Sequence, residues 1–262
     1  MVKAARTVPL LALLVGGAAV PLPTHGAAQV QMPAPVRRVP NGAFLAGEYL
    51  EFSIRFKFIH VGTAVLEIPS APTVFGRPCL QLRESVRTAA FFDAFYKVRD
   101  RVESCLDAEA LVPLKFERHL SEGSYRMEEE TFFDQQRHLA VNLDTEAVVP
   151  AHVQDTLSAF YYVRTLKLEP GMTIQMPSFE GTVVHPLQVI VHRRETLKVP
   201  AGEFQTVVIE PRLVPGGGLF HSSGPIFLWL TDDARHMPVQ MRTSISLGNV
   251  TAELATYRTG EP

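Results

Sequence analysis

YLEFSIRFKF, residues 49–58, is the stretch that decides the fold class predicted for this chain. Polar and apolar side chains alternate through it, and one face of an extended strand would hold Leu50, Phe52, Ile54, Phe56 and Phe58. A period of two residues is typical of a β-strand with one buried face. A turn at residues 60–62 would let residues 61–68 return beside it. The stretch therefore predicts the first hairpin of an antiparallel sheet.

The same alternation recurs on both sides of one helical segment, with glycine and proline turns between many of the strands. Strands are predicted at residues 79–87, 97–106, 114–120 and 125–133, then at 185–197, 204–213, 226–231, 239–247 and 250–257. Between the two series, Leu157, Phe160, Tyr161 and Arg164 have helical spacing. Asp155 is placed to stabilise the start of that helix. The sequence predicts a mainly β fold with one short connecting helix.

The two strand series resemble each other at a constant offset. Four residues recur 125 positions later, because Asp107, Pro113, Gly123 and Glu128 match Asp232, Pro238, Gly248 and Glu253. Turn residues of this kind are also shared by unrelated β meanders. We favour a duplication. It predicts two related curved antiparallel sheets, barrel-like or opposed as half-barrels, with the helix at their junction.

The N-terminal segment predicts export. Lys3 and Arg6 precede an apolar run at residues 8–20, and small residues follow at 26–28, as in a secretory signal peptide. The run is shorter than the ~20 residues that span a bilayer, so a membrane anchor is the weaker interpretation. We predict a signal peptide at 1–28, a flexible leader at 29–43, a first β half at 44–150, a connecting helix at 151–170 and a second β half at 171–258.

The charge balance of the mature chain argues against a nucleic-acid partner. Removing 28 of the 262 residues would leave 234, with 23 basic and 27 acidic side chains. Nucleic-acid binding requires a basic surface. We therefore expect a periplasmic protein with no nucleic-acid partner and no transmembrane segment in the mature chain.

Cys79 and Cys105 are the two cysteines, and export to an oxidising compartment would allow a disulfide between them. A hairpin that places them opposite each other also opposes Arg83 to Arg101, which is unfavourable. A register shifted by two residues pairs Arg83 with Glu103 and separates the cysteines. Both registers stay open. Neither the cysteines nor the scattered histidines have metal-site spacing, so no metal or cofactor is expected.

Three carboxylates are candidate site residues. Glu84 and Asp100 each alternate in phase with apolar neighbours on their strands, and Glu210 is the counterpart of Glu84 in the second series. A carboxylate on an apolar face needs a partner. One interpretation, which we favour, is a structural ion pair with Arg55, Arg118 or Arg164. The other is a carboxylate with a raised pKa inside a pocket.

Aromatic side chains are concentrated in FFDAFY, residues 91–96, which has four of them in six positions: Phe91, Phe92, Phe95 and Tyr96. A connection this apolar either docks onto the sheet, which is the more common case, or forms the lip of an apolar cavity. In the second case it would face Phe160 and Tyr161 of the helix. An exposed patch would mark a binding surface.

Several local patterns follow one another along most of the chain. They are FFDAFYKV at 91–98, DRVES at 100–104, QDTLSAFYY at 154–162, PAGEF at 200–204, and WLTDD at 229–233 with Pro238 and Val239. Together they resemble the bacterial family named domain of unknown function 3108, from about residue 44 to residue 257. The resemblance implies an exported, β-rich protein. It implies no catalytic residue, because the family has no assigned activity.

These observations favour binding over catalysis. The sequence has no GxSxG motif and no other recognisable nucleophile context, so no catalytic residue is predicted. The leading hypothesis is a periplasmic protein that binds or carries an apolar or amphiphilic envelope component. One alternative is a structural or assembly factor that binds another envelope protein through a sheet edge or residues 91–96. The other is a glycan- or lipid-acting hydrolase whose carboxylates, Glu84, Asp100 or Glu210, converge in a cleft.

Overall fold

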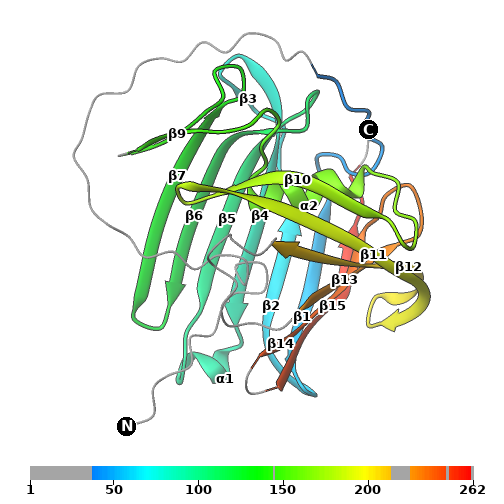
Figure 1. The fold of residues 1–262 in the computed structure, drawn as a ribbon. Helices are drawn as coiled ribbons and strands as arrows, with labels where there is room; N and C mark the ends of the chain where they lie inside the picture. The colour runs from blue at the N-terminus through cyan, green and yellow to red at the C-terminus, as the bar shows by residue number, and fades with distance from the viewer. Residues whose placement is uncertain (1–36, 144, 214–224, 246–247, 261–262) are drawn as a thin grey trace.

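The computed structural model describes residues 37–143, 145–213, 225–245 and 248–260 (Figure 1). The predicted signal peptide and residues 29–36 of the predicted leader lie outside these ranges. The other leader residues contact the folded body: the Val39 amide donates to the Glu109 carbonyl over 2.8 Å, and Ala43 is buried. Within the described ranges, no helix is long and apolar enough to cross a membrane.

Antiparallel strands dominate the described chain, which confirms the mainly β fold. The strands are β1 (Tyr49–Phe56), β2 (Ile59–Glu67), β3 (Thr73–Val74), β4 (Arg77–Thr88), β5 (Arg99–Asp107), β6 (Pro113–Glu122), β7 (Tyr125–Asp134), β8 (Leu139–Asn142), β9 (Glu146–Val148), β10 (Thr173–Glu180), β11 (Val183–Val199), β12 (Gly202–Leu213), β13 (Ile226–Thr231), β14 (Pro238–Ile245) and β15 (Gly248–Arg258). The helices are α1 (Ala90–Asp93) and α2 (Thr156–Arg164). Every predicted strand has a counterpart, and α2 lies within the predicted helical segment.

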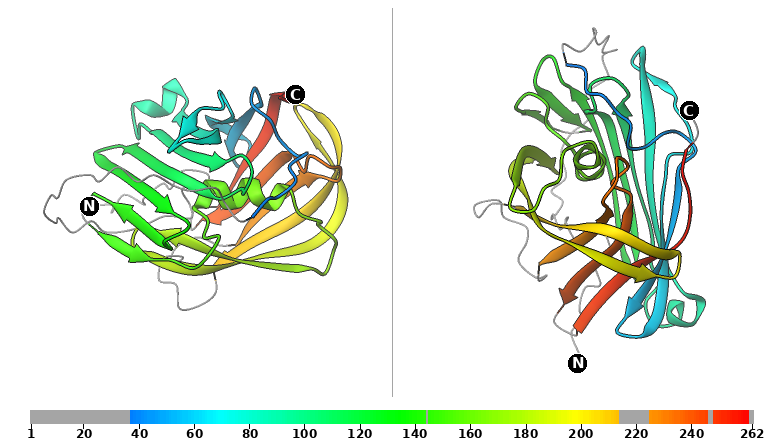
Figure 2. Two further views of the ribbon diagram at one scale, coloured as in Figure 1. Left: turned by 90° about the horizontal axis from the view of Figure 1, so that it is seen from above. Right: turned by 90° about the vertical axis from the view of Figure 1, so that its right-hand side faces the viewer.

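The two strand series form one continuous sheet rather than two separate ones. Its order is β10-β11-β12-β13-β14-β15-β1-β2-β4-β5-β6-β7-β8-β9, and β3 pairs with β4. The link between the series is the β1–β15 ladder, in which Phe52 lies opposite Leu254. The end strands β9 and β10 are not paired with each other, so the sheet stays open. Figure 2 shows the sheet curving around α2.

The first hairpin turns earlier than its sequence suggests. Strand β1 ends at Phe56, and Lys57 adopts a left-handed conformation with φ of 55°. Ile59 then pairs with Phe56 at the start of β2. The turn therefore takes up Phe58, which is 78 % exposed instead of lying on the buried face. The predicted turn at residues 60–62 is wrong.

The residues that suggested a duplication occupy equivalent places in the fold. Pro113 begins β6, and Pro238 begins β14. Gly123 and Gly248 lie at the following turns and have φ of 55° and 135°, a region that L side chains rarely adopt. Both series therefore use the same turn chemistry, whereas the duplication itself stays a prediction.

The hairpin of β4 and β5 has the shifted register and nevertheless contains the disulfide. Arg83 lies opposite Glu103 and binds it over 2.7 Å. Cys79 and Cys105 are then diagonal neighbours on the outer face, with Cα atoms 5.6 Å apart, and they are bonded. The expectation that this register separates the cysteines is wrong, because a diagonal pair across adjacent strands is within disulfide reach.

Helix α2 begins at a complete capping box. The Asp155 side chain accepts from the Leu157 and Ser158 amides, and the Ser158 hydroxyl accepts from the Asp155 amide. Ser104 of β5 donates to the same Asp155 carboxylate over 2.6 Å. A cap replaces missing intrahelical partners, and here it also fixes the helix to the inner face of the sheet.

Candidate functional site

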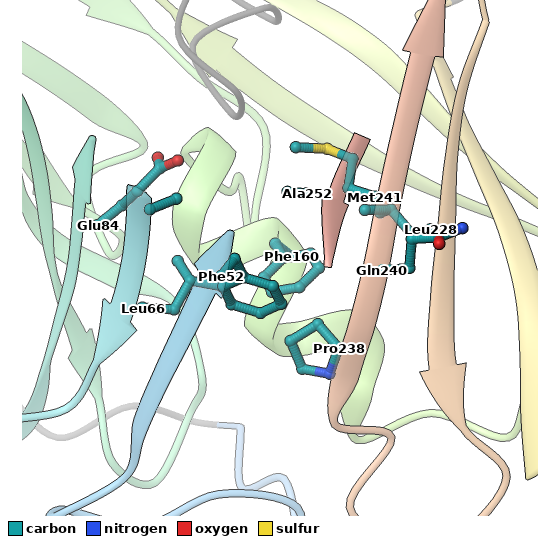
Figure 3. A pocket seen from close by; sticks show the side chains of 10 residues that line it. Phe52, Leu66, Glu84, Phe160, Leu228, Pro238, Gln240, Met241 and Ala252 are labelled. Atoms are coloured by element: carbon teal, nitrogen blue, oxygen red, sulfur yellow. The ribbon is translucent and has the colours of Figure 1, made fainter. Parts of the chain in front are cut away.

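The inner face of the sheet meets α2 at a small cavity between the two strand series (Figure 3). Phe160 of α2, Glu84 and Gln240 contribute to its lining, and Figure 3 shows the Gln240 amide directed away from it. The volume is about 20 Å³, enough for about one water molecule. The remaining lining is apolar and consists of Phe52, Ala64, Leu66, Leu228, Pro238, Met241 and Ala252.

Strand register explains why these side chains face the same space. Leu66 lies opposite Glu84 in the β2–β4 ladder, and Leu228 lies opposite Met241 in the β13–β14 ladder. Residues directly opposite each other in an antiparallel pair project from the same face. The two series therefore supply facing walls, and Phe160 reaches between them from the helix.

Glu84 is the carboxylate at this cavity, and it is 4 % exposed, as its phase on the strand predicts. Two arginines proposed as its partners form their ion pairs with other residues. Arg164 binds Glu48 through two hydrogen bonds of 2.7 and 2.8 Å, and Arg118 binds Glu129 across β6 and β7. These two buried ion pairs therefore involve glutamates that the sequence did not single out.

The charge of Glu84 acts on Tyr161, which is buried on α2. Burial raises the pKa of the Tyr161 hydroxyl well above its ordinary value. The negative charges of Glu48 and Glu84 raise it further, and Arg164 opposes them. Tyr161 is therefore a neutral hydroxyl at physiological pH.

Asp100 projects from the same face as Glu84 but belongs to a different cluster. It accepts a hydrogen bond from the Ser121 amide over 2.8 Å. Burial raises the pKa of its carboxyl, and hydrogen bonds with Ser121 and the Glu122 side chain partly oppose that rise. Tyr96 donates to Glu122 over 3.4 Å. Asp100 and Tyr96 therefore meet around Glu122, near one end of the sheet.

Glu210 lies on the opposite, outer face of the sheet. Its neighbour Ile209 is opposite Leu228 of the cavity, so the next residue along β12 projects away. Burial raises its pKa, but bonds from Arg212 and His192 outweigh that effect and leave the pKa below its ordinary value. The three candidate carboxylates thus do not converge in one cleft, as the hydrolase alternative requires.

The candidate aromatic residues form two separate clusters. Phe91 contacts Phe92 and Phe95, with ring centroids 5.2 and 5.6 Å apart. Phe160 and Tyr161 contact each other, and Tyr161 also packs on Phe44. In Figure 1, α1 and α2 lie well apart, α1 at one end of the sheet and α2 against its inner face. Residues 91–96 therefore do not form a lip over the α2 aromatics.

A second inner cavity holds the polar cluster that sequence reasoning missed. It has a volume of about 10 Å³ and is lined by Arg118, Glu129, Thr131 and Glu180, among others. The sequence names Arg118 only as a possible ion-pair partner; because Arg118 is in phase with Phe116 on β6, the rule that selected Glu84 could also have placed it inside. In the described part of the chain, no group of three or more His, Cys, Asp or Glu side chains is placed to hold a metal ion.

Fold and cavity together define an open, single-sheet β protein that encloses a helix and has a largely apolar interior. The chain belongs to the family described as protein of unknown function DUF3108, whose model matches residues 51–255. The family resemblance of the local sequence patterns is thereby confirmed. No curated protein matches the chain.

The comparison with solved structures finds bacterial proteins that align with most of this chain. One is a β-barrel-like protein of the domain of unknown function DUF1849 from Brucella abortus, 8 % identical, with a TM-score of 0.58 over 84 % of this chain and 100 % of that chain. Another is a protein with a YmcC-like fold from Bacteroides fragilis, 11 % identical, with a TM-score of 0.36 over 85 % of this chain and 99 % of that chain. At 8 % identity, the first likeness shows a shared fold.

Proposed function

We propose that this protein is exported to the periplasm and binds an apolar or amphiphilic envelope component on the inner face of its sheet. The observation that supports this function best is the cavity beside α2. Its apolar walls come from both strand series, and Glu84 is the one carboxylate among its lining residues. Apolar clefts with a few polar groups are typical of small-molecule sites. The apolar body of a ligand would contact the walls, and a hydrogen-bond donor would meet Glu84.

Binding requires the lining to move, because a cavity of about 20 Å³ is far smaller than a lipid chain. Met241 is suited to such movement, since an unbranched thioether side chain adapts to irregular space. Phe160 is the other candidate, because it enters the cavity from the helix rather than from the sheet. We therefore propose that a ligand displaces these two side chains.

Native mass spectrometry tests this function. The protein would be purified from the envelope fraction without denaturant, and bound species would be identified after solvent extraction. We expect one reproducible class of amphiphile bound to the intact protein. A protein that is free of bound species in repeated preparations would overturn the proposal.

Variants locate the bound species within the fold. Ala252→Val narrows the cavity, and Ala140→Val is its matched control, because Ala140 is also buried but does not line the cavity. We expect Ala252→Val alone to lower the bound fraction severalfold, with similar melting temperatures for both variants.

Glu84→Gln tests the carboxylate of the cavity, and it should reduce binding while the fold persists. A loss of stability in Glu84→Gln with unchanged binding would indicate a structural role instead.

Docking of another envelope protein is a second candidate, and the end strand β9 favours it. Among the described residues, one edge of β9 pairs with no other strand, and Val148 on it is 82 % exposed. Free backbone groups at such an edge can accept a strand from a partner. A crosslinked partner that is lost in Val148→Pro, together with an empty interior, would favour this function.

A further inference from the structure

Three connections place apolar side chains at the same end of the sheet. We call this set the aromatic tip and define it as Phe58 of the β1–β2 turn, Ile59 at the start of β2, Phe91 and Phe95 around α1, and Tyr125 at the start of β7. The register makes these connections neighbours. Thr88, just before α1, lies opposite Gly62 of β2, and Val98, just after α1, bridges Glu122 at the end of β6. Figure 1 shows α1 projecting from this end.

The side chains of the aromatic tip are strongly exposed. Phe58, Phe91 and Phe95 are 78, 72 and 76 % exposed, and Ile59 and Tyr125 are also exposed. An isolated exposed apolar residue is ordinary, whereas a group of five on adjacent turns marks an interaction surface.

Contacts below the aromatic tip hold these side chains in place. The Ala89 amide donates to the Val61 carbonyl over 2.9 Å, and Thr88 donates to Asp93 over 2.5 Å. The Tyr96 ring packs on Gly123, where a Cβ atom would come within 3.0 Å of it. Phe91 and Phe95 are therefore presented on a supported turn, with each other as ring neighbours.

The charges around the aromatic tip are mostly positive. Residues 57–60, 89–98 and 123–126 contain three basic residues, Lys57, Lys97 and Arg126, and all three are exposed. Their one acidic residue is Asp93, which forms an ion pair with Arg99. This end of the molecule is thus complementary to a negatively charged surface.

We propose that the aromatic tip docks the protein on a lipid surface that carries anionic headgroups. The Phe side chains would enter the boundary between headgroups and acyl chains, and the Lys and Arg side chains would contact the headgroups. A protein partner suits this surface less well, because the cores of protein interfaces are depleted in charge whereas basic residues here alternate with the apolar ones. The proposal does not depend on a ligand inside the sheet.

Vesicle sedimentation tests this proposal with the full mature chain. The probes are vesicles of phosphatidylcholine with and without phosphatidylglycerol, at low and high salt. We expect binding to the phosphatidylglycerol vesicles at low salt that weakens as salt screens the charges. No sedimentation with these vesicles at low salt would overturn the proposal, as would capture of a protein partner through Phe91 and Phe95 without vesicle binding.

Two variants test the two parts of the aromatic tip. Phe91→Ser with Phe95→Ser should weaken vesicle binding by roughly tenfold or more, because each buried aromatic ring contributes strongly to partitioning. Lys57→Glu with Lys97→Glu should remove the preference for phosphatidylglycerol. The control is Leu143→Ser, a similarly exposed apolar residue between β8 and β9, which should bind as the wild type does. Wild-type binding by the double serine variant would contradict the docking surface.

Discussion

Glu180 illustrates at the residue scale how burial sets the chemistry of this interior. It lies in the second inner cavity with Arg118 and Glu129. Burial raises its pKa from the ordinary 4.5 to about 7; the charge of Arg118 lowers the pKa and that of Glu129 raises it. Glu210 is also buried, yet its bonds with Arg212 and His192 keep its pKa low. The partners of a buried carboxylate, rather than burial alone, decide its charge.

Glu180→Gln should change how stability depends on pH. The folded-state pKa of about 7 lies above the ordinary 4.5, so the protonated form favours the folded state. The protonated Glu180 carboxyl makes its full contribution to the free energy of unfolding below about pH 4.5, and this contribution is lost as pH rises through about 7. Urea unfolding should show the wild type losing on the order of 3 kcal/mol relative to Glu180→Gln across that window.

The exposed Glu128→Gln is the control for this measurement, since its side chain is 85 % exposed. It should follow the wild-type curve. Parallel curves for wild type and Glu180→Gln would show that Glu180 keeps an ordinary pKa in the folded protein.

At the scale of single elements, the β4–β5 hairpin has two different kinds of link. The Arg83–Glu103 pair is partly exposed, and such pairs contribute about 1 kcal/mol or less. The Cys79–Cys105 disulfide is buried beneath Val74 and Phe75 and closes a loop over 26 positions of sequence. The covalent link is therefore expected to dominate the stability of this hairpin.

Reduction of the disulfide should lower the free energy of unfolding by about 3 kcal/mol, because the unfolded chain regains loop entropy. The measurement is denaturant unfolding of the oxidised and reduced protein. Cys79→Ala with Cys105→Ala should behave like the reduced wild type. Equal unfolding midpoints for the oxidised and reduced protein would contradict this expectation.

At the scale of the whole molecule, the Arg164–Glu48 pair connects parts that are distant in sequence. Arg164 ends α2, Glu48 directly precedes β1, and both side chains are buried. The Arg164 guanidinium also donates to the Ala43 carbonyl and the Arg235 carbonyl, each over 3.3 Å. One side chain thus joins the helix to the N-terminal segment and to the β13–β14 connection.

Arg164→Met should cost about 3–5 kcal/mol of folding free energy, because it leaves Glu48 buried without its cation. Arg164→Met combined with Glu48→Leu should recover most of that loss, since the pair is then replaced by apolar side chains. Lys167→Met is the control, because the Lys167–Glu169 pair is exposed. If Arg164→Met and Lys167→Met lost the same free energy of unfolding in urea, the buried Arg164–Glu48 pair would contribute no more than an exposed pair, which would contradict this prediction.

The sequence predicted the long strands well because alternation over eight or more residues leaves little ambiguity. Strands β3, β8 and β9 have two to four residues, too few for a period to show. The sequence does not predict β10, because Pro177 interrupts it, and proline is tolerated there since β10 is an end strand. Helix α1 has a single turn, which is too short for helical spacing to show.

The candidate site was less predictable than the fold. Phase on a strand correctly placed Glu84 and Asp100 on the buried face. It could not show that Glu210 faces outward, because Glu210 was selected by its position in the repeat rather than by its own pattern. Nor could it find Glu48, whose partner Arg164 is 116 residues away. Phe58 was placed wrongly because the hairpin turns at Lys57 and Phe58 rather than at residues 60–62, and alternation does not show where a strand ends.

Because its two end strands are not paired with each other, the sheet differs from a closed barrel in what sets the width of its interior. The radius of a closed barrel is set by its strand number and stagger, so its lumen cannot grow without breaking ladder hydrogen bonds. In the described part of this chain, β9 and β10 are not joined. The two ends of the sheet are connected by side-chain packing instead, because Phe133 of β7 contacts Phe179 of β10 with ring centroids 5.7 Å apart. The width of the interior is therefore set by side-chain contacts between the ends of the sheet, and these contacts can be lost without breaking a ladder hydrogen bond.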